Sequence, residues 1–518
     1  MDDKTPASIV GWKSWVLLGL AVLAIGLYLI ATTVLIAEDG IPYIRRAQQC
    51  TSDIGRAFQI PGIGYPFLIS VVHSLFYPDS TLAIGWIISA QGTTLGCRFA
   101  ALLLLYGIAR RWIGRRQSFM AMLALAFLPY PARFGSDTMR DWPFLVFLIA
   151  GMGSLWVGCR NRRLEWFVIA GCLSGMGYLF RVEGAQVVLL GLIALGVEWF
   201  ARFTDQSRRR LALAGVFLLA GFYVGGGWQM TLRGKILPDK LRFGRIQTTH
   251  EPASERIVAR PEPGPVLAAI DPAPRWNSKA FVKTPWVLLR QTAECMSPHM
   301  LAIAWIGLVT AWRRMSGRST ARFWIGLWGG FQIVMLIYLY STYGYMSRRH
   351  VLPIVVALCL FLPEGFEYVA RCILGTSGVA SNPVGFRRMV WILLAAGMAI
   401  NVPKLASPLR EDKRGYRLAS RWLAENTPEG TKVLVDDARI AFYADRPYLI
   451  RPSKTSVSQR YPYLVSRKSR DAGNPQVRKR GVAEPVYSAP LNSRSQDEVV
   501  VYRILRPPFR KPPPQKGP

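Results

Sequence analysis

Long apolar stretches, separated by short segments rich in arginine, dominate the pattern of hydrophobic and polar positions along this chain. Most of them approach the roughly 20 residues that an α-helix needs to cross a bilayer. The first is too long for the core of a signal peptide and has no convincing cleavage site after it, so we expect it to be retained. The pattern predicts about eleven membrane-spanning helices, near 14–37, 81–109, 117–132, 142–158, 164–180, 184–200, 211–230, 285–311, 323–342, 350–370 and 389–405.

Arginine clusters orient these helices, because short loops rich in Arg and Lys remain in the cytoplasm. Between consecutive clusters there is room for one helix out and one helix back. We therefore expect a multi-pass protein of the plasma (inner) membrane, with a cytoplasmic N-terminus and an external C-terminus. The clusters lie at 110–116, 160–163, 208–210, 313–322 and 387–388.

The non-membrane segments of the predicted transmembrane domain, 1–405, face mainly outward as loops 38–80 and 231–284. Within the first loop, the apolar segment from Tyr65 to Tyr77 is too short to cross a bilayer and is predicted to lie at its surface. The second loop carries seven prolines, which disfavour a continuous helix or sheet. Its composition fits a lid or binding loop, and equally a solvated spacer.

A small external α/β appendage is predicted at 406–450. Its helix covers 414–426, where apolar positions have helical spacing, and a Pro-Gly break separates this helix from a short strand at 432–436. The remainder, 451–518, is basic and rich in proline, which predicts a largely disordered tail. A strand at 498–502 is a candidate to return to the appendage.

The chain carries 64 Lys and Arg residues against 31 Asp and Glu. Orientation of helices and contact of the tail with anionic lipids explain much of this excess. Three external arginines, Arg181, Arg348 and Arg349, are also candidates to hold an anionic substrate, although ordinary snorkelling at the interface would place Arg348 and Arg349 similarly. Nucleic-acid binding is not expected, because the tail lacks interleaved aromatic residues and lies outside.

Carboxylates near the membrane are scarce, which makes each of them a candidate for function. Glu38 and Asp39 directly follow the first span, where they either take part in chemistry or simply end the helix among solvated headgroups. Arg181 and Glu183 interrupt an apolar stretch. Ionisable groups at such a point are costly unless they are paired or functional, so these two predict either a substrate contact or a structural ion pair.

Several short motifs follow one another in a characteristic order. They are Glu38-Asp39-Gly40 with Tyr43, Pro61-Gly62-Ile63-Gly64-Tyr65-Pro66-Phe67-Leu68, Leu128-Pro129 before a turn ending in Asp141, Gly175 to Gly184, Arg348-Arg349-His350-Val351-Leu352-Pro353, and Trp422 to Pro428. This series resembles the membrane GT-C glycosyltransferases of the protein O-mannosyltransferase and lipid A aminoarabinose transferase type. The resemblance spans roughly residues 14–445.

The resemblance implies transfer of a sugar from a polyprenyl-phosphate donor to a lipid, glycan or protein acceptor at the outer membrane face, with inversion at the anomeric carbon. Such a transfer needs a carboxylate that takes the proton of the acceptor hydroxyl. It also needs cations or hydrogen-bond donors that stabilise the departing phosphate. A general acid is not required, because the departing phosphate is a weak base and can leave without being protonated.

By the same resemblance, the base is Asp39 or its neighbour Glu38, and Asp39 is preferred because Asp39-Gly40 and Tyr43 fit the family pattern better. The second acid of the family corresponds to Asp141, with Asp137 as the backup. A carboxylate at the Asp141 position would also be favoured simply by the dipole of the helix that follows.

The resemblance also gives roles to the external arginines. Arg181 would bind the carrier phosphate or support the site through Glu183. Arg349, together with Arg348, is the other phosphate candidate, because a guanidinium presents forked donors.

Two positions depart from the family pattern: a glycine follows the acidic pair, and His350 stands where a tyrosine often follows the arginine. Some GT-C enzymes hold a divalent ion between the two acidic loops and others need none, so a divalent metal remains open, and no ligand cluster in the sequence decides it.

Two other functions stay open. One is a transporter or flippase, against which the lack of internal repeats argues. The other is an O-antigen ligase-like enzyme of envelope polymers.

Overall fold

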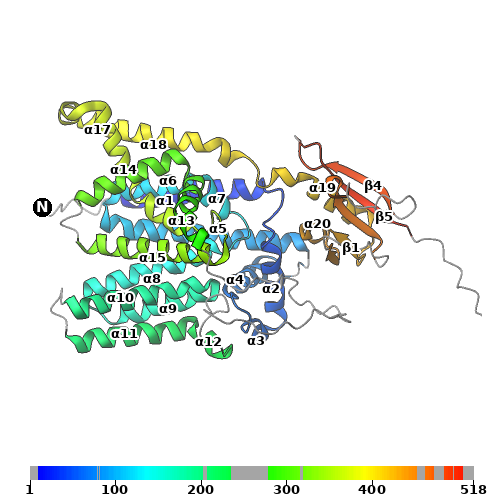
Figure 1. Cartoon of the computed structure of the whole chain (residues 1–518), viewed down its shortest axis with the longest axis horizontal. Helices are drawn as coiled ribbons and strands as arrows, with labels where there is room; N and C mark the ends of the chain where they lie inside the picture. The colour runs from blue at the N-terminus through cyan, green and yellow to red at the C-terminus, as the bar shows by residue number, and fades with distance from the viewer. Residues whose placement is uncertain are drawn as a thin grey trace, which may run out of the picture.

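The chain folds into a bundle of helices with a small sheet-containing domain at one end (Figure 1). The short helices α2, α3 and α4 lie at the same end of the bundle, between its long helices and the sheet. The computed structural model describes residues 10–78, 80, 82–201, 207–234, 278–314, 319–451, 461–471, 483–493 and 495–505.

Seven helices in the described residues are long and apolar enough to cross a membrane, and the number rises to nine if each of two bent helix pairs is one span. The chain is thus an α-helical, multi-pass membrane protein. The bundle helices are α1 (Val10–Ala31), α5 (Ala83–Trp112), α6 (Arg115–Phe127), α8 (Asp141–Asn161), α9 (Glu165–Phe180), α10 (Gln186–Ala201), α11 (Arg208–Phe222), α13 (Ser278–Met296), α14 (Pro298–Arg314), α15 (Ser319–Tyr343), α16 (Leu352–Cys359), α17 (Leu362–Ser381) and α18 (Pro383–Ala406).

The predicted spans differ from these helices at four places. The span predicted at 350–370 falls on two helices, α16 and α17, which meet at an angle of 48°. The spans at 117–132 and 164–180 correspond to α6 and α9, which have only 13 and 16 residues. The single helix predicted at 285–311 is wrong, because α13 and α14 meet at an angle of 108°. The break falls at Ser297, which has a φ of 74°, and proline at the next position suits the first turn of a new helix.

Loops and short elements at the end of the bundle nearest the sheet carry most of the residues that the sequence singled out. The short apolar helix predicted at Tyr65 to Tyr77 is confirmed as α4. Most of the loop predicted at 231–284 lies outside the described residues. The short elements are α2 (Gly40–Ser52), α3 (Ile54–Ala57), α4 (Gly64–Phe76), α7 (Pro129–Phe134), the 3₁₀ turn η1 (Val182–Ala185), the π-turn η2 (Tyr223–Gly227) and α12 (Trp228–Leu232).

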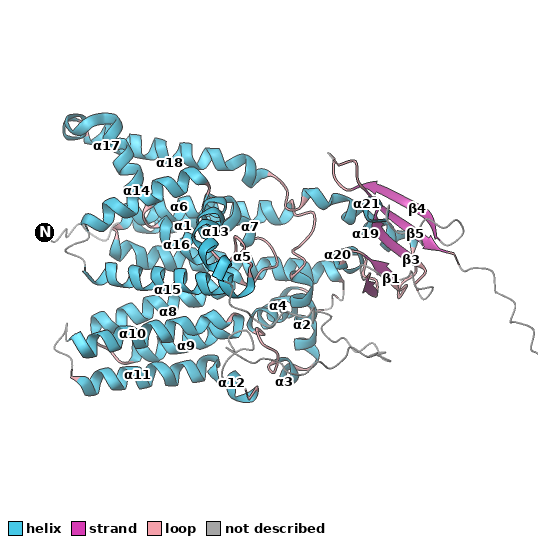
Figure 2. Cartoon of the chain, viewed as in Figure 1, coloured by secondary structure: helices cyan, strands magenta, loops and turns pink. Residues whose placement is uncertain are grey.

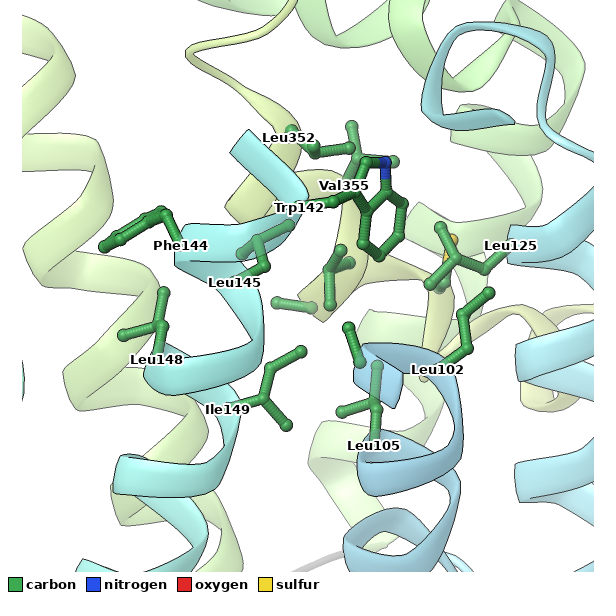
Figure 3. Packing of buried hydrophobic residues seen from close by; sticks show 14 of the residues in the cluster. Leu102, Leu105, Leu125, Trp142, Phe144, Leu145, Leu148, Ile149, Leu352 and Val355 are labelled. Carbon is green, nitrogen blue, oxygen red and sulfur yellow. The ribbon is translucent and has the colours of Figure 1, made fainter. Parts of the chain in front are cut away.

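Trp142 anchors the start of α8 in the core. Its side chain is only 1% exposed, and its indole Nε1 donates to the carbonyl of Pro131 at 2.9 Å. Figure 3 shows the ring among aliphatic side chains of several helices, including Leu125 and Val355. Because α8 begins at Asp141, this anchor also fixes the position of that carboxylate.

Arg98 is a fully buried cation in the middle of α5. Its Nη2 donates to the carbonyl of Ala126 at 2.8 Å, near the end of α6. The chain continues through Pro129 and Pro131, which cannot donate to the last carbonyls of that helix. A cation is favourable at a helix C-terminus, so Arg98 stabilises the break that leads into α7 and the loop beyond it.

The C-terminal domain is built on a five-stranded sheet of order β2-β1-β3-β5-β4 (Figure 2). Strand β1 pairs in parallel with β2 and β3, whereas β5 pairs antiparallel with β3 and β4. The elements of this domain are η5 (Glu411–Lys413), α19 (Arg414–Asn426), β1 (Val433–Val435), α20 (Ala438–Tyr443), β2 (Tyr448–Ile450), β3 (Tyr463–Arg467), α21 (Lys468–Asp471), β4 (Ala483–Pro490) and β5 (Glu498–Ile504).

Alternating side chains bury the two faces of this sheet separately, as strand geometry requires. Val433 and Val435 pack with Leu423 of α19, whereas Leu434 packs in a separate cluster on the other face. The predicted helix and the strand of the appendage are present as α19 and β1, and the returning strand as β5. Three strands come from beyond residue 450, so the predicted end of the appendage falls inside the sheet.

The C-terminal domain is fastened to the segment between α1 and α2. Arg439 donates to the carbonyl of Ile36 at 3.3 Å, and the backbone N–H of Ile36 donates to the Tyr443 hydroxyl at 3.0 Å. Arg439 is itself paired with Asp437, and both side chains are almost fully buried. These contacts lie two residues before Glu38, and the contact continues in α2, where the guanidinium carbon of Arg45 lies 4.6 Å from the centre of the Tyr448 ring.

Acid is expected to weaken this domain through Asp437. Burial by itself raises the pKa of the Asp437 carboxyl, but hydrogen bonds and the charge of Arg439 outweigh burial and hold the pKa below its usual value. A lowered folded-state pKa contributes stability above the unfolded value, and this stability is lost as the pH falls through the folded value. Thermal unfolding measured from pH 7 down to pH 3 should show a loss below about pH 4, which Asp437→Asn should reduce. The exposed Asp445, changed to Asn, is the matched control; equal acid sensitivity of the Asp437→Asn variant and the wild type would contradict this expectation.

Candidate functional site

Asp39 and Arg349 form an ion pair between residues 310 positions apart in the chain. Asp39 directly precedes α2, and Arg349 lies in the turn before α16. The Asp39 side chain is 49% exposed and that of Arg349 is 28% exposed. The carboxylate is therefore held by a cation and still open to a reactant.

Arg181 connects the other two acids that the sequence singled out. Its guanidinium pairs with Asp141 at the start of α8 and with Glu183 in η1, the latter at 3.1 Å. Arg181 and Asp141 are only 12% and 5% exposed, whereas Glu183 is 42% exposed. The ion pair between Arg181 and Glu183 that the sequence suggested is thus present. Asp141 makes it a group of three, in which Glu183 is the member that reaches the surface.

The turn that carries Arg181 and Glu183 depends on a close approach of two backbones. A Cβ atom on Gly184 would lie only 2.2 Å from backbone atoms of Gly177 and Tyr178. The hydroxyl of Ser174 also donates to the carbonyl of Gly184 at 2.8 Å. The glycines of this segment therefore allow η1 to fold back on α9 and present its charges at the C-terminal end of that helix.

The two acid–arginine groups belong to one electrostatic cluster. Burial alone lowers the pKa of Arg349, but hydrogen bonding and charge from Asp39, and then the charge of Asp141, raise it. Arg140 lies over the ring of Tyr43, with its guanidinium carbon 5.7 Å from the ring centre, and it donates to the carbonyl of Phe180 beside Arg181. The structure thus brings loops from four parts of the chain together.

Asp137 has a different environment from Asp141. It is 2% exposed, and it accepts from the backbone N–H groups of Ala37 and Thr138 at 2.9 and 2.8 Å. Its second oxygen pairs with Arg410 at 2.5 Å. Donors from the protein therefore occupy both oxygens of the Asp137 carboxylate. Asp137 connects its own loop to the segment before Asp39 and does not face a space for substrate.

Glu38 faces away from its neighbour Asp39. It lines a polar cavity of about 260 Å³ against the C-terminal domain. Acids and bases both contribute to this cavity, so it has no strong preference for one sign of charge. Its other lining residues are Asp412, Lys413, Tyr416, Asp436, Asp437, Arg467, Arg470 and Leu491.

Arg348 also points away from the acidic cluster, although it is adjacent to Arg349. Its Nε donates to Glu294 at 2.7 Å, and its guanidinium carbon lies 4.4 Å from the centre of the Tyr130 ring. Lys404 lies over the same ring at 4.1 Å. Arg348 therefore connects α13 and α7, and Lys404 adds α18 to the same group, whereas Arg349 contacts Asp39.

A metal site is not formed by the side chains that the structure describes. In those residues, no group of three or more His, Cys, Asp or Glu side chains has the arrangement to hold an ion. The carboxylates of the cluster are instead matched with arginines.

Comparisons with known proteins agree with this architecture. Residues 63–228 match the model of the dolichyl-phosphate-mannose-protein mannosyltransferase family. This segment contains Asp141, Arg181 and Glu183 but neither Asp39 nor Arg349. A sequence comparison with curated proteins finds no match.

Solved structures show the same fold over most of the chain. The structure of ArnT from Cupriavidus metallidurans bound to undecaprenyl phosphate matches with a TM-score of 0.60 and 15% identity, covering 95% of this chain and 98% of that one. The fold is of the GT-C type. The oligosaccharyltransferase of Archaeoglobus fulgidus, in a complex with Zn and sulfate, matches with a TM-score of 0.55 and 14% identity, covering 87% of this chain and 67% of that one. The resemblance to GT-C glycosyltransferases is confirmed at the level of the fold.

Several residues in or next to this group of charged loops were not singled out in the sequence as site residues. Tyr43 was named only as part of a motif, His350 only as a departure from the family pattern, and Arg140, Glu294 and Arg410 not at all. Arg140 could have been found from its position beside Asp141. Nothing in the local sequence marks Glu294 or Arg410, because their partners lie 54 and 273 positions away.

Proposed function

We propose that this chain transfers a sugar from a polyprenyl-phosphate donor to an acceptor hydroxyl at the outer face of the plasma membrane, with inversion. The observation that carries the proposal is the contact between the exposed Asp39 and Arg349. It places a carboxylate able to accept a proton beside a cation able to bind phosphate. The GT-C fold and the mannosyltransferase family match over 63–228 support this choice of reaction.

In the proposed reaction, the acceptor oxygen bonds to the anomeric carbon while the bond from that carbon to the phosphate oxygen breaks. The acceptor proton passes to Asp39, and the electron pair of the broken bond leaves with polyprenyl phosphate. Arg349 binds this phosphate in exchange for part of its contact with Asp39. A guanidinium suits both partners, because carboxylate and phosphate each accept its forked donors.

Arg181 has a supporting part in the proposal. Its charge is already matched by Asp141 and Glu183, so it holds the second acidic loop in place. Asp137 and Glu38 are not assigned contacts with the donor. Glu38 lines the cavity against the C-terminal domain, and we assign this cavity to the acceptor.

The experiment is reconstitution in nanodiscs with a panel of radiolabelled polyprenyl-phosphate sugars and membrane extract as the source of acceptor. Release of polyprenyl phosphate and transfer of label are both measured. Arg349→Ala should lower donor use by about tenfold or more, because a hydrogen bond to a charged group contributes about 1.5–3 kcal/mol. Arg348→Ala is the matched comparison and should have a smaller effect. Equal losses in the two variants, or no transfer from any donor by the wild type, would contradict the proposal.

A further inference from the structure

His350 lies in the turn between α15 and α16, next to Arg349, and its imidazole is held in one orientation. The backbone N–H of Ser347 donates to its Nδ1 at 3.0 Å. The backbone N–H of His350 donates back to the carbonyl of Ser347, also at 3.0 Å. The ring packs perpendicular to that of Tyr345, with ring centres 5.8 Å apart and planes at 88°. This turn determines which edge of the imidazole is free.

The contact with Ser347 also determines the tautomer. A backbone N–H can only donate, so Nδ1 must be the unprotonated nitrogen that accepts. The proton of the neutral ring then resides on Nε2, which is a donor. In the part of the chain that the structure describes, Nε2–H makes no hydrogen bond to the protein, whereas Nδ1 is fully used.

The charges around His350 keep the ring neutral. Burial, and then the positive charges of Arg181 and Arg349, lower the pKa of the imidazole to about 4, against the smaller opposing influence of Asp141 and Glu183. These groups come from the end of α9, the turn of His350 itself, the start of α8 and η1. Throughout the range from about pH 5.5 to 8 the ring therefore offers one fixed N–H and no change of charge.

We propose that Nε2–H of His350 donates a hydrogen bond to a non-bridging oxygen of the phosphate of the polyprenyl donor. This inference rests on the proposed function. The two arginines beside it, Arg181 and Arg349, are already engaged by carboxylates, whereas the N–H of His350 is not.

The contribution of such a donor grows during the reaction. As the bond to the anomeric carbon breaks, negative charge accumulates on the phosphate oxygens, and a fixed N–H stabilises that charge without reorganisation. The proton stays on Nε2 throughout, so His350 is neither an acid nor a base in this step. It binds the leaving group, and Asp39 takes the proton of the acceptor.

Three substitutions separate the role of Nε2–H from that of ring packing. In His350→Gln the side-chain amide reaches the place of Nε2 and restores a donor, in His350→Asn it reaches only the place of Nδ1, and His350→Phe keeps a ring without donors. We expect His350→Asn and His350→Phe to weaken binding of undecaprenyl phosphate in nanodiscs by about tenfold or more. His350→Gln should recover most of this loss. Thermal melting of each variant identifies any that fail to fold.

The wild-type protein provides an independent measurement. Solid-state NMR of ¹⁵N-histidine-labelled protein, with the His350→Gln spectrum used for assignment, should show the Nε2–H tautomer of His350 unchanged from pH 5.5 to 8. Added undecaprenyl phosphate should shift the Nε2 signal. The Nδ1–H tautomer, or an Nε2 signal that does not move at saturating lipid, would overturn the inference.

The binding and transfer measurements also separate this inference from the proposed function. If wild type and His350→Phe bind the lipid equally and transfer sugar equally, the role of His350 is wrong and the proposed function stands. If the wild type binds undecaprenyl phosphate but uses no polyprenyl-phosphate sugar, the proposed reaction is wrong while the phosphate contact of His350 is still measured. If the wild type binds no undecaprenyl phosphate, both are wrong.

Discussion

Asp39→Asn is expected to lower sugar transfer by about 10²–10⁴-fold, which is the usual contribution of a general base. The substitution keeps the shape of the side chain and an oxygen that can accept from Arg349, but it removes the group that accepts the proton. Binding of the donor should therefore change little, and the loss should appear in kcat. Single-turnover transfer from a labelled polyprenyl-phosphate sugar, together with donor binding, measures the two effects separately.

Glu38→Gln is the matched control for this prediction. The two acids are adjacent in the chain, yet Asp39 contacts Arg349, whereas Glu38 lines the cavity against the C-terminal domain. A loss in Glu38→Gln should affect the acceptor KM more than kcat. Full transfer in Asp39→Asn, or a larger loss of kcat in Glu38→Gln than in Asp39→Asn, would remove Asp39 as the base.

Asp137→Ala is expected to destabilise the protein by about 3–5 kcal/mol, because it leaves the cation of a buried ion pair without its partner. The substitution removes the acceptor of the Ala37 and Thr138 N–H groups as well as the partner of Arg410. Equilibrium unfolding in mixed micelles measures this loss. Transfer should fall too, because Ala37 lies two residues before Asp39 and its position depends on Asp137.

Removing both members of the pair tests the physical reason. The double variant Asp137→Ala/Arg410→Ala should be less destabilised than the sum of its single variants, since neither charge then remains buried alone. Additive effects would show that the two side chains act independently. A wild-type unfolding free energy in Asp137→Ala would show that the two acidic loops are held together by other contacts.

The cluster also explains why adjacent residues differ in role. Arg348 and Arg349 follow each other, but Arg348 reaches Glu294 and Tyr130, and Arg349 reaches Asp39. The side chains of Glu38 and Asp39 likewise reach different partners. In both pairs, adjacent residues point their side chains in different directions, so a sequence motif alone does not tell which of the two takes part in the reaction.

Much of the membrane domain could be predicted because its determinants are local. The apolar stretch that becomes α1 and the one that becomes α5 can be recognised from their length, since a span must satisfy its own backbone hydrogen bonds. The bend between α13 and α14 was missed because proline is compatible with the first turn of a helix and equally with the interior of a predicted span. Nothing in composition distinguishes these two cases.

The sheet shows the same limit. Strand β1 and the returning strand β5 were predicted from short apolar runs, but β3 and β4 were hidden in a segment whose basic, proline-rich composition suggests disorder. Their pairing is non-local: Val465 of β3 faces Val501 of β5. Burial of one face against α19 supplies the free energy that composition alone did not reveal.

By itself, the sequence determined that the chain is a helical, multi-pass membrane protein, because the length of its apolar stretches shows which segments can cross a bilayer. It also marked Asp39, Asp141, Arg181 and Arg349 as candidates for function, because a charge in apolar surroundings costs free energy wherever it occurs. Only the tertiary structure decided which of these charges meet. It paired Asp39 with Arg349, joined Asp141 to Arg181, and buried Asp137 under the first loop. The physical reason is that ion pairs act over a few ångströms, and the fold alone brings residues hundreds of positions apart to that distance.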